Sequence, residues 1–162
     1  MLSEQQRTAL EEAYRTLGGD LWRAVYAFAE GDRAIADDAV AHAFIEAGPR
    51  LGRIRELRPW LYSVAFRRAA ADLRAGRRTI PLESTIAGQR SIPDPDVDLV
   101  ELLQLLAPLS SKQRSAFVLR QIYGYSTAET ASLLGVSEVA VRVHLHGART
   151  RLKTSLEEVE RL

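Results

Sequence analysis

Cysteine is absent from the 162-residue sequence, which excludes disulfide bonds and thiolate metal sites. Long hydrophobic runs are also absent, since no segment approaches the ~20 consecutive apolar residues that a membrane-spanning helix requires. The first residues show neither the basic flank nor the apolar core of a secretory signal peptide. Apolar residues still make up 46% of the chain, so a packed core can form. We therefore expect a soluble, cytoplasmic protein with no membrane insertion.

Net charge is scarce as well, because the formal total is only +1. That total hides a strong separation of charge along the chain. Residues 1–48 carry a net charge of −5 and residues 79–106 carry −4, whereas residues 49–78 carry +7 and residues 107–162 carry +3. The local field, rather than the total charge, steers a polyanion toward a protein. A single charged block is as often a solvated helix face, but two basic blocks separated by an acidic one favour a nucleic-acid partner.

Strand-like alternation persists nowhere, and apolar residues recur at helical spacing instead. Ser3-x-x-Gln6 is a capping-box pattern that predicts the start of a first helix. We expect Gly18-Gly19 to end this helix and Asp20 to begin a second one. A third helix is expected to follow the break at Gly31-Asp32 and to stop at Gly48-Pro49.

After a basic segment, Pro59 is expected to be the first residue of the next helix. The pattern changes between residues 79 and 96, where three prolines and no sustained period indicate a flexible linker. Helical spacing returns at Val97. The sequence therefore predicts an all-α fold with two small helical domains, residues 1–78 and residues 97–162, joined by the linker 79–96.

Two short helices with a tight joint are predicted in the second domain. Ser126-x-x-Glu129 opens the first, Gly135 suits a left-handed position at its end, and Ser137 can cap the second. This arrangement is typical of a DNA-reading helix-turn-helix. Helical spacing predicts that the second helix buries Val141, Leu145, Ala148 and Leu152. Its other face is then expected to carry Glu138, Val139, Arg142, Val143, His146 and Arg149.

The side chains on that face suit DNA. Arg142 and His146 can reach base edges or phosphates, whereas Arg149 and Arg151 lie further along and suit phosphates. A helical hairpin whose exposed face merely carries arginine is the alternative. His144 lies two residues from His146 and points to a different side of the helix, so no metal site is expected.

The segment "RPWLYSVAFRRAAADLRAGRR" in the first domain mixes aromatic and basic residues. Aromatic rings offer stacking surfaces for unpaired bases, and arginines hold the nucleic-acid backbone. Packing in the core is the alternative, and it is strongest for Trp60 at the helix start.

The segment "DDAVAHAFIEA", followed by the one above, is similar to the second conserved region of a known family. The segment "LSSKQRSAFVLRQIYGYSTAETASLLGVSEVAVRVHLHGARTRL" is similar to that family's fourth region. The chain thus resembles the extracytoplasmic-function group of bacterial RNA polymerase sigma factors over nearly its whole length. The resemblance implies that the first domain binds core RNA polymerase and captures the opened non-template strand of the minus-ten element. The second domain would read the minus-thirty-five duplex of promoter DNA.

The resemblance also assigns residues to each site by position. The helix that meets core polymerase corresponds to Asp37, Asp38, Val40 and Phe44. Promoter melting and single-strand binding correspond to Arg55, Arg58, Trp60, Tyr62, Arg67, Arg68 and Arg74. Duplex reading corresponds to Ser137, Glu138, Arg142, Val143, His146, Arg149 and Arg151. Nucleotide addition stays with the polymerase, so no catalytic residue and no cofactor are implied, and an anti-sigma factor is a further implied partner.

Several positions depart from the family's usual pattern. Ala41-His42 stands where a Gln-Glu pair is usual, so weaker binding to core polymerase is expected. Arg67 stands where Asn is frequent, and Val143 and Gly147 replace a common Ser and a common Arg. Fewer basic side chains predict fewer phosphate contacts and a shallower salt dependence. Gly147 is also expected to weaken its helix by ~1 kcal/mol relative to Ala.

Two other functions are compatible with parts of the sequence. One is a stand-alone transcriptional regulator with a LuxR-like helix-turn-helix, which would need a receiver or ligand domain that the first 78 residues do not resemble. The other is a sigma-like decoy that binds polymerase or an anti-sigma factor without melting DNA. An enzyme is not expected, because adjacent Asp37-Asp38 on a helix point apart and no partner base is evident.

Overall fold

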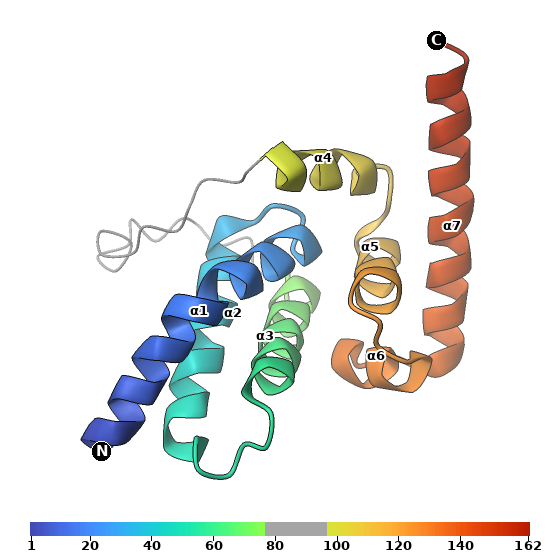
Figure 1. Ribbon diagram of the computed structural model, residues 1–162. Helices are drawn as coiled ribbons and strands as arrows, with labels where there is room; N and C mark the ends of the chain where they lie inside the picture. Colours follow the sequence, from blue (N-terminus) through green and yellow to red (C-terminus); the bar gives the residue numbers. More distant parts are fainter. Residues whose placement is uncertain (77–96) are drawn as a thin grey trace. The chain divides into compact units, whose positions relative to one another are not determined.

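The structure is a computed structural model that describes residues 1–76 and 97–162 (Figure 1). The described residues form helices and no β-strand, which confirms the predicted all-α fold. The chain separates into two compact units, Met1–Asp96 and Val97–Leu162. The predicted linker, residues 79–96, lies outside the described residues. None of the described helices is both long enough and apolar enough to cross a membrane.

Helix α1 runs without a break over Glu4–Phe28. Its start has the predicted capping box, since the Ser3 hydroxyl accepts from the Gln6 N–H and the Gln6 side chain accepts from the Ser3 N–H. The prediction that Gly18-Gly19 ends the helix is wrong. Each helical glycine costs ~1 kcal/mol relative to Ala, but the buried face of α1 continues on both sides of the pair. A Cβ on Gly18 would make an ordinary van der Waals contact with the Tyr14 ring at 3.5 Å, so packing at this position does not require glycine.

The end of α1 contains two residues in the left-handed region, Glu30 at φ 62° and Gly31 at φ 77°. The Gly31 N–H donates to the Tyr26 carbonyl at 2.9 Å, which closes the helix as in a Schellman motif. Glu30 therefore occupies the position that usually holds glycine. The break predicted at Gly31 and Asp32 is confirmed, because Asp32 caps helix α2, Arg33–Ala47.

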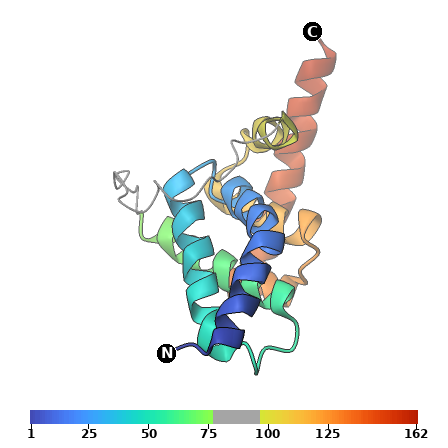
Figure 2. The same ribbon diagram turned by 60° about the vertical axis from the view of Figure 1, so that its left-hand side comes forward.

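A 3₁₀ turn, η1 (Gly48–Arg50), and helix α3 (Leu57–Arg74) complete the first unit. Figure 2 shows α1, α2 and α3 of this unit packed side by side. Helix α3 begins two residues before Pro59, so the prediction that Pro59 opens the helix is wrong by two positions. Proline is tolerated there because the N–H groups of a first helical turn have no helical partner.

Aromatic rings join the three helices of the first unit. Tyr14 of α1 meets Phe44 of α2 edge-on, with 5.1 Å between ring centroids. Phe28 of α1 meets Phe66 of α3 at 5.2 Å, and both rings are almost completely buried. The core of this unit therefore lies between all three helices.

The second unit holds α4 (Val97–Leu106), α5 (Ser111–Phe117), a π-helical turn η3 (Val118–Ile122), α6 (Thr127–Leu134) and α7 (Glu138–Glu160). Helices α5 and α6 both pack against α7. The long α7 is thus supported by two shorter helices, which fixes the direction in which its other side faces.

The turn η3 continues α5 with wider hydrogen-bonded rings. The Tyr123 N–H donates to the Val118 carbonyl, five residues earlier, at 3.1 Å. The Tyr125 N–H donates to the Leu119 carbonyl at 3.0 Å, and Arg120 Nη1 donates to the Tyr125 carbonyl at 2.6 Å. The side chain of Arg120 therefore fastens the connection that leads into α6.

Candidate nucleic-acid and protein interfaces

Helices α6 and α7 form the predicted helix-turn-helix, with each predicted cap in place. Ser126 and Glu129 exchange both capping-box hydrogen bonds, at 3.0 and 3.1 Å. Hydrogen bonds from Ser126, first its backbone N–H and then its side chain, lower the pKa of the Glu129 carboxyl. Gly135 is left-handed at φ 68°, and the Ser137 hydroxyl accepts from the Ala140 N–H at 3.1 Å.

The two sides of α7 differ as the sequence predicts. Its inner side buries Val141, Leu145 and Ala148, while Leu152 is half-buried. Its outer side exposes the predicted set Ser137, Glu138, Val139, Arg142, Val143, His146 and Arg149. The fold therefore brings the predicted duplex-reading residues to one accessible face.

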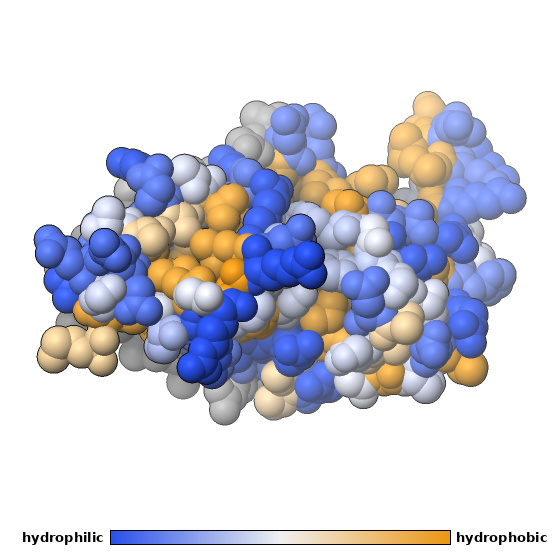
Figure 3. Space-filling view, turned by 60° about the horizontal axis from the view of Figure 1, so that its bottom comes forward, coloured by the Kyte–Doolittle hydropathy of each residue, from blue (hydrophilic) through white to orange (hydrophobic). Residues whose placement is uncertain are grey.

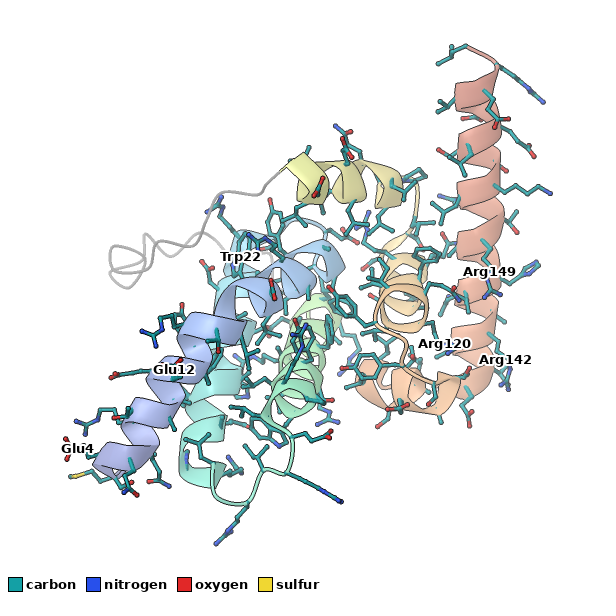
Figure 4. All side chains as sticks on the ribbon, in the orientation of Figure 1. Glu4, Glu12, Trp22, Arg120, Arg142 and Arg149 are labelled. Carbon is teal, nitrogen blue, oxygen red and sulfur yellow. The ribbon has the colours of Figure 1, made fainter. Side chains whose placement is uncertain are left out.

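Arg142, His146 and Arg149 follow one another at steps of four and three residues, so they form a single row on α7. We call these three residues the α7 row. Arg142 and Arg149 project from the side of α7 that is turned away from α5 and α6 (Figure 4). Neither arginine forms a hydrogen bond or an ion pair with another described residue. No other described side chain therefore competes with a ligand for either guanidinium group.

Gly147 lies on α7 where this helix crosses the start of α5. A Cβ at this position would lie 2.7 Å from Nε2 of Gln113, which is closer than real Cβ atoms approach a neighbour. Gln113 cannot move freely, because its Oε1 accepts from the Ser110 N–H at 3.1 Å in the capping box of α5. The missing side chain at position 147 therefore lets α7 pack closely on the capped end of α5.

Arg151 is exposed but is bound within the second unit. Its Nη1 donates to the Pro108 carbonyl at 2.9 Å, which ties α7 to the segment before α5. The structure thus separates Arg151 from Arg142 and Arg149, whose guanidinium groups have no such partner within residues 1–76 and 97–162.

The residues predicted for strand opening fall into two groups that differ in how accessible they are. Arg55, Arg58, Arg67 and Arg74 are exposed on the loop before α3 and along α3. Trp60 is half-buried in the first turns of α3. These five residues remain accessible candidates for contact with a nucleic acid.

Tyr62 and Arg68 are less accessible. Arg68 is half-buried and contacts Asp38 of α2. Tyr62 is 7% exposed, and its ring packs beneath the Arg58 guanidinium at 5.4 Å and against Phe66 at 6.1 Å between centroids. Burial raises the pKa of the Tyr62 hydroxyl, and the nearby Arg58 acts in the opposite direction. As placed, the Tyr62 ring supports α3 from within and does not offer a face on which a base could stack.

The residues predicted to meet core polymerase on α2 also divide. Val40 and Phe44 are 4% and 5% exposed, so they belong to the core of the unit and do not form its surface. Asp37 is half-buried, and its Oδ1 accepts from Trp22 Nε1 at 2.8 Å. Only Asp38 of the four is exposed. The predicted contact surface must therefore be corrected, because helical periodicity turns Val40 and Phe44 inward.

A row of polar residues lies on α2 at steps of four; Asp38 was predicted to meet polymerase, whereas Glu46 was missed. It consists of Asp38, His42 and Glu46, which we call the α2 row. His42 Nε2 lies 3.0 Å from Glu46 Oε1, and Arg68 of α3 contacts both Asp38 and His42. The i, i+4, i+8 spacing was the signal that could have revealed the row, whereas its partner on α3 is distant in sequence.

Exposed apolar side chains accompany both rows. Ile45 of α2 is 72% exposed, and Val139 and Val143 of α7 are 63% and 62% exposed. Figure 3 shows hydrophobic side chains reaching the surface between hydrophilic ones on the face turned to the reader. Among the described residues, no group of three or more His, Asp or Glu side chains is arranged to hold a metal ion.

Comparison with known proteins identifies the chain. Residues 99–152 match the family described as sigma-70, region 4. The ECF RNA polymerase sigma factor SigC of Mycobacterium tuberculosis is 30% identical over 158 residues, covering 92% of this chain and 84% of SigC. SigL of the same organism is 31% identical over 150 residues, covering 86% of this chain and 84% of SigL. The chain belongs to the ECF RNA polymerase sigma factors.

Solved structures agree with this assignment of the sigma factor. CnrH, solved in complex with the cytosolic domain of CnrY, is 26% identical, with a TM-score of 0.57 and coverage of 94% of this chain and 90% of the other. RpoE from Bartonella quintana, solved with the anti-sigma factor NepR, shares the fold at 19% identity and a TM-score of 0.61, with coverage of 91% and 96%. The function is therefore that of a sigma factor, which directs the initiation of transcription. A LuxR-like helix-turn-helix alone would not produce a match that spans both units.

Proposed function

We propose that this sigma factor divides promoter recognition and polymerase binding among three surfaces. The α7 row reads the minus-thirty-five duplex, the basic side of α3 and its preceding loop hold the opened minus-ten strand, and the α2 row meets core polymerase. The observation that carries the proposal is the α7 row, because it presents Arg142, His146 and Arg149 outward from the second helix of a fully capped helix-turn-helix. That helix enters the major groove in proteins of this kind.

Duplex reading divides between base edges and phosphates. Arg142 lies in the second turn of α7, near the helix N-terminus that enters the groove, and arginine recognises guanine through two hydrogen bonds. His146 and Arg149 follow further along and hold the backbone. Arg151 takes a structural role through Pro108. Gly147 does not belong to this surface, because a side chain there would meet Gln113 of α5.

Strand opening relies on the exposed arginines of the first unit. Arg55, Arg58, Arg67 and Arg74 can bind the phosphates of a single strand, and Trp60 can stack with an unpaired base. Binding the opened bases compensates for stacking that is worth a few kcal/mol per flipped base. The buried Tyr62 maintains the position of α3, and polymerase retains all catalytic residues.

Polymerase binding relies on the accessible side of α2. The α2 row supplies two carboxylates, Asp38 and Glu46, and Ile45 adds an exposed apolar side chain beside them. An apolar contact surrounded by acidic groups complements a basic protein surface. His42 interrupts the acidic character of the row, which supports the expectation of weaker core affinity.

A protein that sequesters the factor is the further partner. RpoE was solved with an anti-sigma factor, and CnrH was solved with the cytosolic domain of CnrY. By analogy, an anti-sigma factor holds this chain in the cytoplasm until its promoters are needed.

The test is reconstitution of transcription with core RNA polymerase. Purified chain is added to core enzyme, binding is measured by co-purification, and start sites are mapped on a library of genomic promoter fragments. We expect stable binding and new start sites that share a minus-ten and a minus-thirty-five element. Binding without any transcription would indicate a decoy, and an absence of binding would overturn the proposal.

A matched pair of variants separates the surfaces. Arg142→Ala should leave core binding unchanged and alter promoter choice. Arg161→Ala removes an arginine beyond the last turn of the same helix and should change neither property. If both variants select promoters as the unmodified chain does, α7 does not read the duplex through Arg142.

A further inference from the structure

Arg68 contacts three side chains of the first unit. Its Nη2 lies 2.9 Å from Asp38 Oδ2, and its Nε lies 3.4 Å from Asp72 Oδ2. Its Nη1 lies 3.4 Å from His42 Nδ1. One side chain of α3 thus reaches two members of the α2 row and a buried carboxylate of its own helix.

The contacts of His42 fit one tautomer of the neutral ring. A guanidinium group only donates, so a hydrogen bond from Arg68 is accepted by Nδ1 of His42. That tautomer carries its proton on Nε2, which lies 3.0 Å from Glu46 Oε1 and is placed to donate to it. Arg68, His42 and Glu46 therefore form a directed chain of hydrogen bonds that begins on α3 and ends at the far end of the α2 row.

We propose that Arg68 is a positioning residue for polymerase binding, which orders the whole α2 row, and that it is not a contact to single-stranded DNA. This inference rests on the proposed function, in which the α2 row meets core polymerase. Holding Asp38, His42 and Glu46 in fixed rotamers before binding reduces the side-chain entropy that is lost when the complex forms.

Two observations distinguish positioning from the alternatives. The side chain of Asp38 remains 53% exposed, and a carboxylate accepts about four hydrogen bonds, so Arg68 leaves room for a second cation from the polymerase. A DNA phosphate that approached Arg68 would meet the negative charges of Asp38 and Asp72. Like charges at that distance disfavour DNA binding, whereas Arg67 on the exposed side has no such obstacle among the described residues.

The test separates affinity for core polymerase from strand opening at saturation. Binding of Arg68→Ala, Arg68→Lys and Arg67→Ala to core enzyme is titrated, and opening is read from permanganate reactivity of unpaired thymines with the factor in excess. Because ordering one side chain is worth roughly a factor of two to ten in affinity, Arg68→Ala should weaken binding roughly 2- to 10-fold for each side chain of the row that it releases, and it should leave opening at saturation unchanged. Arg68→Lys should restore part of the affinity for core enzyme. Arg67→Ala should leave that affinity unchanged and reduce opening at saturation.

A second variant guards against a loss of folding, because Arg68→Ala removes a partner of the buried Asp72. Asp38→Asn keeps the contact between Arg68 and Asp72 and should also weaken core binding. In the double variant with Arg68→Lys, the combined loss should be smaller than the sum of the two single losses, since part of each acts through the pair of Arg68 and Asp38. Unchanged affinity in Arg68→Ala, or additive losses in the double variant, would overturn the inference. A failure of the unmodified chain to bind core enzyme would instead overturn the proposed function.

Discussion

Nη2 of Arg68, on α3, lies 2.9 Å from Oδ2 of Asp38, on α2. The pair joins a helix assigned to DNA opening with a helix assigned to polymerase binding. An exposed ion pair of this kind contributes at most about 1 kcal/mol to stability, so its main effect is to orient the groups that it joins. The neighbouring contacts to His42 and Asp72 make that orientation specific.

The left-handed residue at the end of α1 gives a prediction about stability. Glu30→Gly should raise the free energy of unfolding by about 0.5–1 kcal/mol relative to Glu30→Ala, because only glycine adopts φ 62° without strain. Both variants lose the same side chain, so the difference isolates the backbone. Urea unfolding of the two variants measures it, and equal midpoints would show that the turn relaxes without strain.

The contact between Gly147 and Gln113 predicts a strongly coupled pair. Gly147→Ala gains about 1 kcal/mol of helix propensity. It displaces Gln113 from its capping box, which costs a similar amount, so the single change should be nearly neutral.

In a Gln113→Ala background, by contrast, Gly147→Ala should stabilise the second unit by the full ~1 kcal/mol. Thermal unfolding of the four proteins of this cycle provides the measurement. Strict additivity would mean that α7 shifts away from α5 without disturbing the cap.

The α7 row predicts how salt affects promoter binding. Each phosphate contact that is lost should reduce the slope of log K against log salt concentration by about 0.9. Arg149→Ala, assayed as the complete factor with core enzyme on a promoter fragment, should therefore flatten the slope by about one unit for every promoter.

Arg142→Ala should act differently, with a loss of discrimination worth about 1–3 kcal/mol at one base pair. Arg161→Ala, outside the row, provides the reference for both changes. A uniform loss across all sequences for Arg142→Ala would reassign this residue to phosphate binding.

The capping box at the start of α6 predicts a dependence of stability on pH. Hydrogen bonds from Ser126 lower the pKa of the Glu129 carboxyl below its ordinary value of 4.5. A carboxyl whose pKa is lower in the folded state stabilises the protein above its unfolded pKa, and this contribution disappears as the pH falls through the folded pKa.

Glu129→Gln keeps an accepting oxygen but cannot titrate. The difference in unfolding free energy between the unmodified chain and this variant should therefore be constant near neutral pH and should shrink below pH 4.5. A difference that stays constant into the acidic range would remove Glu129 from the set of titrating groups that stabilise the fold.

Local sequence patterns predicted most of the helix starts. Ser3 and Ser126 each open a helix with the predicted reciprocal capping box, because the residues involved are only three positions apart. The double glycine at Gly18-Gly19 misled the prediction, since the buried face on both sides outweighs the local cost of glycine.

The sites were predictable to different degrees. The outward face of α7 followed from its period, and its arginines are exposed as expected. The role of Arg68 could not be read from the sequence, because its partners Asp38 and His42 lie on another helix and about thirty positions earlier. The burial of Tyr62 could not be predicted for a related reason, since the same ring can stack on a base or pack in a core.

The π-helical turn η3 has a consequence for how the gene can tolerate insertions and deletions. Its hydrogen bonds span one residue more than those of an α-helix, so Val118–Ile122 contains one residue more than an α-helical turn would need. Loss of the exposed Gln121 could be absorbed there by a change to ordinary helical bonds. Helices α6 and α7 contain no such extra residue, because Ser126, Gly135 and Ser137 fix where each begins or ends. Differences in length among related factors should therefore gather before the helix-turn-helix and spare the part that reads DNA.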